Sequence, residues 1–539
     1  MPLPCPAPTL VTAATPHLPQ PSHVLPVLPS LADWPLFDAA TSRQIEHGAL
    51  AAGAPQSLMA LAGLAVAKLA LAIAPAARQV WIAAGPGNNG GDGLVAGRLL
   101  HLQGWSVRIN LVAGEGSQRP ADAAWALQQA QAAGVPIEPG LAGPPSGSGL
   151  CIDALLGLGN RRAPHGDIAQ AVRLLNGNAA PVLAVDLPTG LCGDTGRRLG
   201  DDVVNAAHTL ALLTLKPGLF TGQGRDAAGR VWWAGLGLGL GLGLSASHPS
   251  ATLQGPGLLR QLLPERSHAQ HKGSFGDLLV IAGAPGMGGA ASLAARAALA
   301  AGAGRVYLAR LDGNEQPDPM RPELMPRSLA QALQPTLLAA ATVVCGCGGG
   351  NAVAASLPAV LAQAARLVLD ADALNAVAAD PALLRALRER AAQGRPSVLT
   401  PHPLEAARLL GRSTAAVQAN RLAAARDLAS LCQATVVLKG SGTVISTPGG
   451  TPVINPTGNA RLGTAGSGDV LAGWLGGLWS QTFATGARQP GEFGARCASG
   501  FNAACAAVWL HGRAAEAGDI RMPLRAADLI EAISAAITE

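Results

Sequence analysis

Short apolar segments alternate with longer segments of helical spacing along most of the chain. The apolar segments are typical of buried strands, and in the first half they lie at 79–84, 107–112, 150–153, 181–186 and 208–213. In the second half they lie at 278–282, 305–309, 342–345, 366–369, 397–399, 435–438 and 443–446. Strands that alternate with helices predict parallel sheets covered on both faces. The pattern therefore predicts an α/β protein with two domains.

Two stretches interrupt this pattern. Residues 1–30 contain nine prolines, which exclude a regular helix or a central strand. Residues 234–247 alternate glycine with leucine, and glycine at every second position destabilises both helices and strands. We therefore predict a disordered tail over 1–30, a first domain over 31–240, a linker over 241–254 and a second domain over 255–539.

Composition excludes several classes of protein. Hydrophobic residues make up 49% of the 539 residues, which is enough for a sizeable core, and the net charge of +5 is spread without the basic block that nucleic-acid binding needs. The eight cysteines are too few for a disulfide scaffold, and Cys345 and Cys347 lack the partner pair of a zinc site. The apolar stretch 58–77 is interrupted by Lys68 and Pro75, which argues against a membrane-spanning helix. We expect a cytoplasmic homo-oligomer with neither a nucleic-acid nor a membrane partner.

The first domain carries polar residues where predicted strands end. A glycine-rich turn over 85–93 lies between a strand and a helix that begins at Leu94, a position that suits a nucleotide. Asn89, Asp153 and Thr189 supply hard oxygen atoms near three strand ends, a set that suits a monovalent cation. The alternative is turn chemistry, because these residue types also favour strand-to-helix turns.

The second domain has a loop of small residues, 463–468, immediately before a predicted helix. Its N–H groups would stabilise a phosphate or a departing oxyanion. Asp469, in the first turn of that helix, is placed to exchange a proton with a substrate hydroxyl. The alternative for Asp469 is a capping role alone.

Further polar residues end neighbouring strands of this domain. Lys439 begins a tight turn and is either a phosphate ligand or an exposed hairpin lysine, while His402 and Glu405 suggest a polar pocket wall. Asp370 and Asp372 follow another strand and could approach a metal-bound phosphate.

In the first domain, the motif Asn88-Asn-Gly-Gly-Asp-Gly93, the stretch from Asp153 to Gly159 and the motif Asp186-Leu-Pro-Thr-Gly190 resemble the YjeF N-terminal family, the NAD(P)H-hydrate epimerases. The resemblance covers roughly 36–240. It implies a Rossmann-like three-layer domain that interconverts the R and S forms of hydrated NADH and NADPH, with Asp186 catalytic. Potassium would be held by Asn89, Asp153 and Thr189, and the implied substrate contacts are Asn88, Asn89, Gly90, Gly91, Asp92, Gly157, Leu158, Gly159, Asn160, Arg161, Arg162, Ala163 and Asp186.

The second domain resembles the ADP-dependent NAD(P)H-hydrate dehydratases, which have a ribokinase-like fold. The matching motifs are His271-Lys-Gly-x-x-Gly276, Gly286-Met-x-Gly-Ala290, Asp370-Ala-Asp372, Thr400-Pro-His-Pro-x-Glu405, Lys439-Gly440 with Thr443, and Thr464-Ala-Gly-Ser-Gly-Asp469. The resemblance covers roughly 255–535 and implies an ADP-driven dehydration of the S form, assisted by magnesium, with Asp469 catalytic.

This second resemblance also implies two sets of binding residues. The hydrated nucleotide would contact Ala290, Gly348, His402, Pro403, Leu404, Glu405, Ala406, Ala407, Arg408 and Asp469. ADP would contact Lys439, Gly440, Ser441, Gly442, Thr443, Asn459, Ala460, Arg461, Leu462, Gly463, Thr464, Ala465, Gly466, Ser467 and Gly468.

The sequence departs from the family patterns at a few positions. Leu158 stands where threonine is more frequent, Thr189 where serine is common, and Leu404 where glycine is usual. Two alternative functions stay open. One is a sugar or pyrimidine kinase fused to an accessory nucleotide-binding domain, and the other is a non-catalytic first domain that serves as a scaffold.

Overall fold

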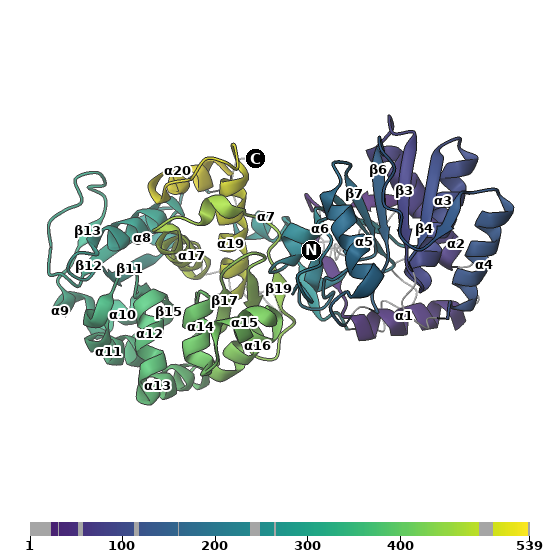
Figure 1. The fold of residues 1–539 in the computed structure, drawn as a ribbon. Coiled ribbons are helices and arrows are strands. Elements are labelled where there is room, and N and C mark those ends of the chain that lie inside the picture. The colour runs from purple at the N-terminus through teal and green to yellow at the C-terminus, as the bar shows by residue number, and fades with distance from the viewer. Residues whose placement is uncertain are drawn as a thin grey trace, which may run out of the picture.

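The structure is a computed structural model that describes residues 23–536, apart from 31, 52–57, 113–117, 160, 238–247, 264–265 and 485–499. Figure 1 shows two α/β domains side by side, each built on one sheet. The predicted α/β class and the two domains are therefore confirmed. Most of the predicted tail, residues 1–22, and most of the Gly-Leu stretch, residues 238–247, lie outside the described residues.

The N-terminal domain contains an eight-stranded sheet. Its strands, in spatial order, are β1 (Val24–Pro26), β9 (Arg230–Ala234), β8 (His208–Leu212), β7 (Val182–Val185), β6 (Leu150–Ala154), β3 (Gln79–Ala84), β4 (Ser106–Leu111) and β5 (Ile137–Pro139). All neighbours are parallel except β1 and β9. The helices are α1 (Ala39–Ala51), α2 (Leu58–Ile73), α3 (Asn88–Leu102), α4 (Ala121–Ala132), α5 (Gly166–Gly177), η1 (Pro217–Leu219) and α6 (Gly224–Ala228).

Helices cover both faces of this sheet. Val80 and Ile82 of β3 belong to the core formed with α2, α3 and α4. Trp81 and Ala83, which alternate with them along the same strand, belong to the core formed with α5. Because β3 is apolar at both sets of positions, the sequence shows a continuous apolar run rather than an alternating one. No described helix is long and apolar enough to cross a bilayer.

The C-terminal domain contains an eleven-stranded sheet. Its strands, in spatial order, are β13 (Met325–Pro326), β12 (Arg305–Arg310), β11 (Asp277–Ala282), β14 (Thr342–Cys345), β15 (Arg366–Leu369), β16 (Ser397–Leu399), β17 (Thr435–Leu438), β18 (Val444–Ser446), β19 (Val453–Ile454), β10 (Ala251–Leu253) and β2 (Trp34–Leu36). The strands from β13 to β17 are parallel, and β17, β18 and β19 form an antiparallel meander.

Helices also cover both faces of the second sheet. One apolar core joins the sheet to α8 (Gly288–Ala300), α17 (Ser467–Ala484), α19 (Phe501–Glu516) and α20 (Ala526–Ala536). The other core joins it to α11 (Leu357–Gln363), α12 (Ala371–Ala379), α13 (Pro381–Ala392), α14 (Pro403–Leu410) and α16 (Arg421–Cys432). The remaining helices are α7 (Gly257–Leu262), η2 (Lys272–Phe275), α9 (Leu329–Ala332), α10 (Pro335–Ala340), η3 (Gly350–Ala355), α15 (Thr414–Ala419) and η4 (Ala460–Leu462).

The ends of the predicted tail and linker are ordered strands, which corrects two predicted limits. Strand β1, inside the predicted tail 1–30, pairs with β9 as an edge strand, where proline is tolerated. Strand β10 lies inside the predicted linker 241–254 and pairs with β2 and β19. Strand β2, which was predicted to belong to the first domain, therefore completes the sheet of the second domain.

The glycine-rich turn predicted over 85–93 is shorter than expected, because α3 already begins at Asn88. The glycines of this helix are required by close packing. A Cβ atom on Gly90 would lie 2.0 Å from the carbonyl oxygen of Gly85, and a Cβ atom on Gly93 would lie 2.5 Å from Cβ of Ala154. The backbone of helix α3 therefore packs directly against the residues at the ends of the strands.

We expect Gly90→Ala to lower the free energy of unfolding by about 1–3 kcal/mol, because the added methyl group meets backbone that cannot move aside. Denaturant unfolding measures this loss. The matched control is Gly48→Ala in α1, where no atom lies within 4 Å of the added Cβ. That variant should be unchanged or up to about 1 kcal/mol more stable. Equal stabilities for the two variants would contradict the packing argument.

Candidate functional site

Three predicted residues of the N-terminal domain meet at the carboxyl edge of its sheet. Asn89 lies in the first turn of α3, Gly157 follows β6, and Asp186 follows β7. A Cβ atom on Gly157 would lie 3.0 Å from Asn89 Oδ1 and 3.4 Å from Asp186 Oδ2. The backbone at Gly157 therefore lies between the two polar side chains, as expected where parallel strands end together.

Asp153 and Thr189, two of the predicted potassium ligands, form a buried pair behind this edge. Asp153 Oδ1 accepts a hydrogen bond from Thr189 Oγ1 at 2.8 Å, and Oδ2 accepts one from the Thr189 N–H at 2.8 Å. Burial raises the pKa of Asp153 to about 6, against the effect of these hydrogen bonds. The hydrogen bonds that the described residues give to this carboxylate come from neutral donors only. A buried carboxylate of this kind suits a cation.

Asp186 forms a buried ion pair with Lys216, a residue that the sequence did not reveal. The Lys216 ammonium donates to Asp186 Oδ1 and, at 3.0 Å, to the carbonyl oxygen of Leu212. Only 2% of the Lys216 side chain is exposed. A lone lysine in the apolar run 209–219 was the available signal, because a lysine in such a run must find a partner if it is buried.

Two further carboxyl groups lie close to Asp186. The pKa of Asp92 is raised well above its usual value by burial and by the negative charges of Asp186 and Glu46. Burial and Asp186 also raise the pKa of Glu46, a residue of α1 that was not assigned to the site. Burial and the neighbouring charges therefore raise the proton affinity of Asp92, which lies beside the ion-paired Asp186.

The predicted loop 157–163 lies at the rim of this site. The carbonyl oxygen of Leu158 accepts a hydrogen bond from Arg43 of α1 at 3.1 Å. Arg161, Arg162 and Ala163 are exposed, and Asn160 lies outside the described residues. The remaining predicted contacts, Asn88, Gly90 and Gly91, form the first turn of α3.

In the C-terminal domain, four side chains from different strand ends meet Asp469, which lies in the first turn of α17. Lys439 Nζ lies 2.8 Å from Asp370 Oδ1, which also accepts a hydrogen bond from Thr400 Oγ1 at 2.7 Å. Ligand atoms of Cys347, Asp370 and Asp469 lie within 4.8 Å of one another. Lys439 is therefore not the exposed hairpin lysine of the alternative interpretation. Cys347 is a site residue that was not predicted.

The charges of this cluster prepare Asp469 to accept a proton. Burial first, and then the negative charge of Asp370, raise the pKa of Asp469 to about 6, although Lys439 opposes the shift. Burial lowers the pKa of Lys439, but the attraction of Asp370 and Glu405 outweighs it and leaves the pKa above its usual value. Asp469 is therefore ionised at pH 7, with a proton affinity that suits a general base.

His402 and Glu405 cap helix α14 and also face this cluster. His402 Nδ1 accepts hydrogen bonds from the N–H groups of Leu404 and Glu405, and Glu405 accepts one from the His402 N–H at 2.8 Å. Burial and the charge of Lys439 lower the pKa of His402, while burial raises the pKa of Glu405. Leu404 is 44% exposed. Pro403, Ala406 and Ala407 belong to the same helix, and Arg408 Nη1 donates to Asn375 at 2.7 Å.

The two segments assigned to ADP meet at the start of α17. A Cβ atom on Gly468 would lie 3.4 Å from Lys439 Nζ, so the turn 439–443 and the loop 459–468 are neighbours. Gly440, Gly442 and Gly466 have positive φ angles, which favour glycine. His511, which was not predicted, holds the carbonyl oxygen of Ser467 at 2.9 Å, and burial lowers its pKa to about 4.

Elsewhere in the cluster, Ala290 and Gly348 are direct neighbours, since a Cβ atom on Gly348 would lie 2.8 Å from that of Ala290.

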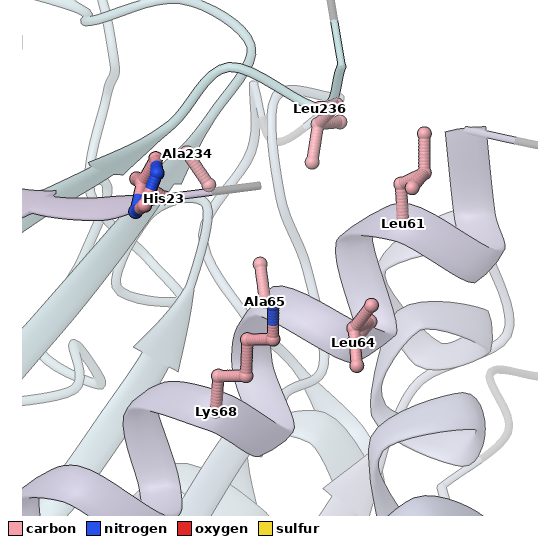
Figure 2. Close-up of a pocket in the computed structure, with 7 residues that line it drawn as sticks. All are labelled: His23, Leu61, Leu64, Ala65, Lys68, Ala234 and Leu236. Atoms are coloured by element: carbon pink, nitrogen blue, oxygen red, sulfur yellow. The ribbon is translucent and has the colours of Figure 1, made fainter. Parts of the chain in front are cut away.

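A separate pocket beside α2 is drawn in Figure 2 and contains none of the predicted site residues. Its lining is mainly apolar and consists of His23, Leu61, Leu64, Ala65, Lys68, Ala234 and Leu236.

Each half of the chain matches a known protein family. The NAD(P)H-hydrate dehydratase family matches residues 278–535, and the YjeF-related N-terminal family matches residues 55–218. The chain is 36% identical over 466 residues to a bifunctional NAD(P)H-hydrate repair enzyme of Escherichia coli K12. The match covers 85% of this chain and 84% of the relative. It is 37% identical over 469 residues to the corresponding enzyme of Coxiella burnetii, with 85% and 93% covered.

A comparison with solved structures also finds matches to part of the chain. An ADP/ATP-dependent NAD(P)H-hydrate dehydratase from Bacillus subtilis is 28% identical, covers 52% of this chain and 95% of its own, and has a TM-score of 0.40. The matches to relatives extend over both domains, so a small-molecule kinase with a scaffold domain is not favoured. The chain belongs to the family of bifunctional NAD(P)H-hydrate repair enzymes.

Proposed function

We propose that the two acidic clusters are the two active sites of this repair enzyme. The N-terminal site interconverts the R and S forms of hydrated NADH and NADPH, and the C-terminal site returns the S form to NAD(P)H at the expense of ADP. The observation that carries this proposal is that each cluster combines a lysine ion pair, Asp186–Lys216 or Asp370–Lys439, with a further carboxyl group, the buried Asp92 or the half-buried Asp469. ADP is the expected co-substrate, and use of ATP is a second possibility for the same site.

In the C-terminal site, Asp469 accepts the proton of the substrate hydroxyl while the hydroxyl oxygen attacks the β-phosphorus of ADP. The P–O bond to AMP breaks, and the N–H groups at the start of α17 stabilise the charge of the phosphoryl group. The phosphorylated hydrate then loses phosphate and a ring proton, which restores the double bond of NAD(P)H. Lys439 holds Asp370 in place and contributes positive charge beside the phosphates.

Magnesium fits this cluster, because Asp370 and Asp469 offer carboxylate oxygens close together and Mg²⁺ binds through one or two carboxylates plus substrate phosphates. When bound, the ion would neutralise phosphate charge. The thiol of Cys347 is a poor ligand for Mg²⁺. We therefore assign the magnesium contact to the Asp370 carboxylate, and Asp469 keeps its role at the substrate hydroxyl.

In the N-terminal site, Asp186 accepts the proton of the C6 hydroxyl as the bond between C6 and the ring nitrogen opens. Asp92, whose pKa is raised by burial and by the charges of Asp186 and Glu46, donates a proton to the nitrogen. Closure from the other face of the carbonyl group gives the opposite epimer. Asp153, Thr189 and the Asn89 carbonyl would hold a potassium ion, which would supply positive charge at this edge of the sheet. The buried, neutral-donor environment of Asp153 supports that assignment.

Absorbance at 340 nm tests this function directly. An R/S mixture of NADH hydrate with ADP and magnesium should recover completely, because epimerisation supplies the S form that dehydration consumes. Omission of ADP should leave the absorbance unchanged. No recovery with either ADP or ATP would refute the repair function. The homo-oligomer and the cytoplasmic location expected from the sequence stay predictions.

A further inference from the structure

One segment of the N-terminal domain, 216–225, touches both proposed active sites. It begins at Lys216, the ion-pair partner of Asp186, and runs through η1 into the first residues of α6. Figure 1 shows α6 at the boundary between the two domains. The residues that follow Lys216 contact the turn 439–443, which we assign to ADP, and the residues that lead into the second ADP loop, 459–468.

The first contact is with the turn between β17 and β18. The N–H of Gly222 donates to the carbonyl oxygen of Ser441 at 3.0 Å, and Thr221 Oγ1 donates to that of Gly442 at 3.1 Å. A Cβ atom on Gly442 would lie 2.0 Å from the carbonyl oxygen of Phe220. The turn therefore packs backbone against backbone with the other domain, and its conformation depends on that contact.

Arg421 of the C-terminal domain joins Thr221 to the backbone at the start of the turn 439–443. Its side chain is buried, and Nη2 donates to the carbonyl oxygens of Leu438 and Lys439 at 3.0 and 3.1 Å. Its Nε donates to Thr221 Oγ1 at 3.2 Å. Burial lowers the pKa of Arg421 to about 10, so the guanidinium is still charged at pH 7. A fixed positive charge therefore lies behind the turn, and a hydroxyl of the other domain completes its hydrogen bonds.

The second contact is with the segment that leads into Asn459. Arg225 Nη2 donates to the carbonyl oxygens of Pro456 and Gly458, at 2.8 and 3.0 Å. On its other side, the N–H of Gly458 donates to Glu516 at 2.9 Å. The segment before Asn459 is therefore held between the N-terminal domain and α19. One ADP loop, and the residues that lead into the other, are therefore anchored on the same short segment of the epimerase domain.

We propose that Thr221 and Arg225 of the epimerase domain are positioning residues for ADP in the dehydratase domain. This inference rests on the assignment of 439–443 and 459–468 to ADP in the proposed function. The two domains are then not independent enzymes joined by a linker. The affinity of the second site for ADP depends on side chains that belong to the first.

The test uses the full chain with Thr221→Val, which keeps the shape of the side chain but removes the hydroxyl. Loss of a buried hydrogen bond to a charged partner should raise KM for ADP about tenfold, because Arg421 and the carbonyl oxygen of Gly442 lose their shared partner. We expect kcat to change less than about twofold, since the catalytic carboxylates are untouched. Thr221→Ser should restore the wild-type KM, because serine retains the hydroxyl.

A matched control is Thr209→Val, which removes a buried threonine hydrogen bond to the carbonyl oxygen of Ala228 inside the same domain. Its KM for ADP should be that of the wild type. Arg225→Met provides an independent variant should Thr221→Val not fold, and it should also raise KM for ADP. Epimerisation rates of all folded variants verify that the first domain is intact.

The outcomes separate the two proposals. Calorimetry that detects no ADP binding to the wild type would overturn the ADP assignment itself. Wild-type binding with an unchanged KM in both Thr221→Val and Arg225→Met would overturn only the positioning role. A loss of kcat with constant KM would also contradict it, because positioning of the ADP loops acts on nucleotide binding.

Discussion

Replacing Asp469 by asparagine is expected to lower kcat for ADP-dependent dehydration by about 10³-fold, because the amide cannot accept the hydroxyl proton. Asparagine has nearly the same shape, and it removes a carboxylate whose burial opposes ionisation. The fold should therefore be retained, and KM for ADP should change little. The measurement is the initial rate of absorbance recovery at 340 nm, with the S form of NADH hydrate at saturating ADP.

The pH profile provides a second readout of the same role. Because the pKa of Asp469 is raised to about 6, the wild-type rate should fall as the pH drops below about 6 and the carboxylate takes a proton. Residual activity of Asp469→Asn should lack this step. The control is Asp427→Asn, which changes an exposed carboxylate paired with Arg412 and should leave kcat and the profile unaltered. Activity within twofold of wild type in Asp469→Asn would refute the assigned role.

The position of Asp469 at the start of a helix could be predicted from the sequence because its signal is local. A loop of small residues, an acidic residue and a helix follow one another without interruption, and the structure places them as that order suggests. Lys439 was similarly visible at the end of a strand. Lys216 and Arg421 were not, because their partners Asp186 and Thr221 lie 30 and 200 residues away in the chain. Such pairs are decided by tertiary packing and leave no spacing that a sequence pattern can show.

The same distinction between local and long-range signals applies to the fold. The long apolar runs of β3 and β11 and the helices that follow them predicted interior strands of both sheets. Strand β2, at the edge of the second sheet, and its neighbour β10 have three residues each and pair across more than 200 residues of chain. A strand that short has too few positions for a recognisable period. The predicted domain limits at 31, 241 and 255 therefore missed the exchange of β2 into the second sheet.

Lys216→Met should combine the largest loss of stability with the loss of one activity. The substitution leaves Asp186 buried without its ammonium partner, which typically costs about 3–5 kcal/mol in free energy of unfolding. Epimerisation should fail, because the carboxylate is no longer held in its productive position. Recovery at 340 nm of an R/S mixture should then become biphasic, with a fast phase from the S form and a slow phase at the uncatalysed rate of epimerisation.

A double variant separates these two effects. Lys216→Met combined with Asp186→Asn removes both charges, so most of the lost stability should return, while epimerisation should stay absent. Arg173→Met, which breaks the exposed pair with Asp202, should cost less than about 1 kcal/mol and keep the recovery monophasic. If the double variant recovered epimerisation together with stability, the ion pair would be structural only, and the base of the first site would have to be sought in Glu46 or Asp92.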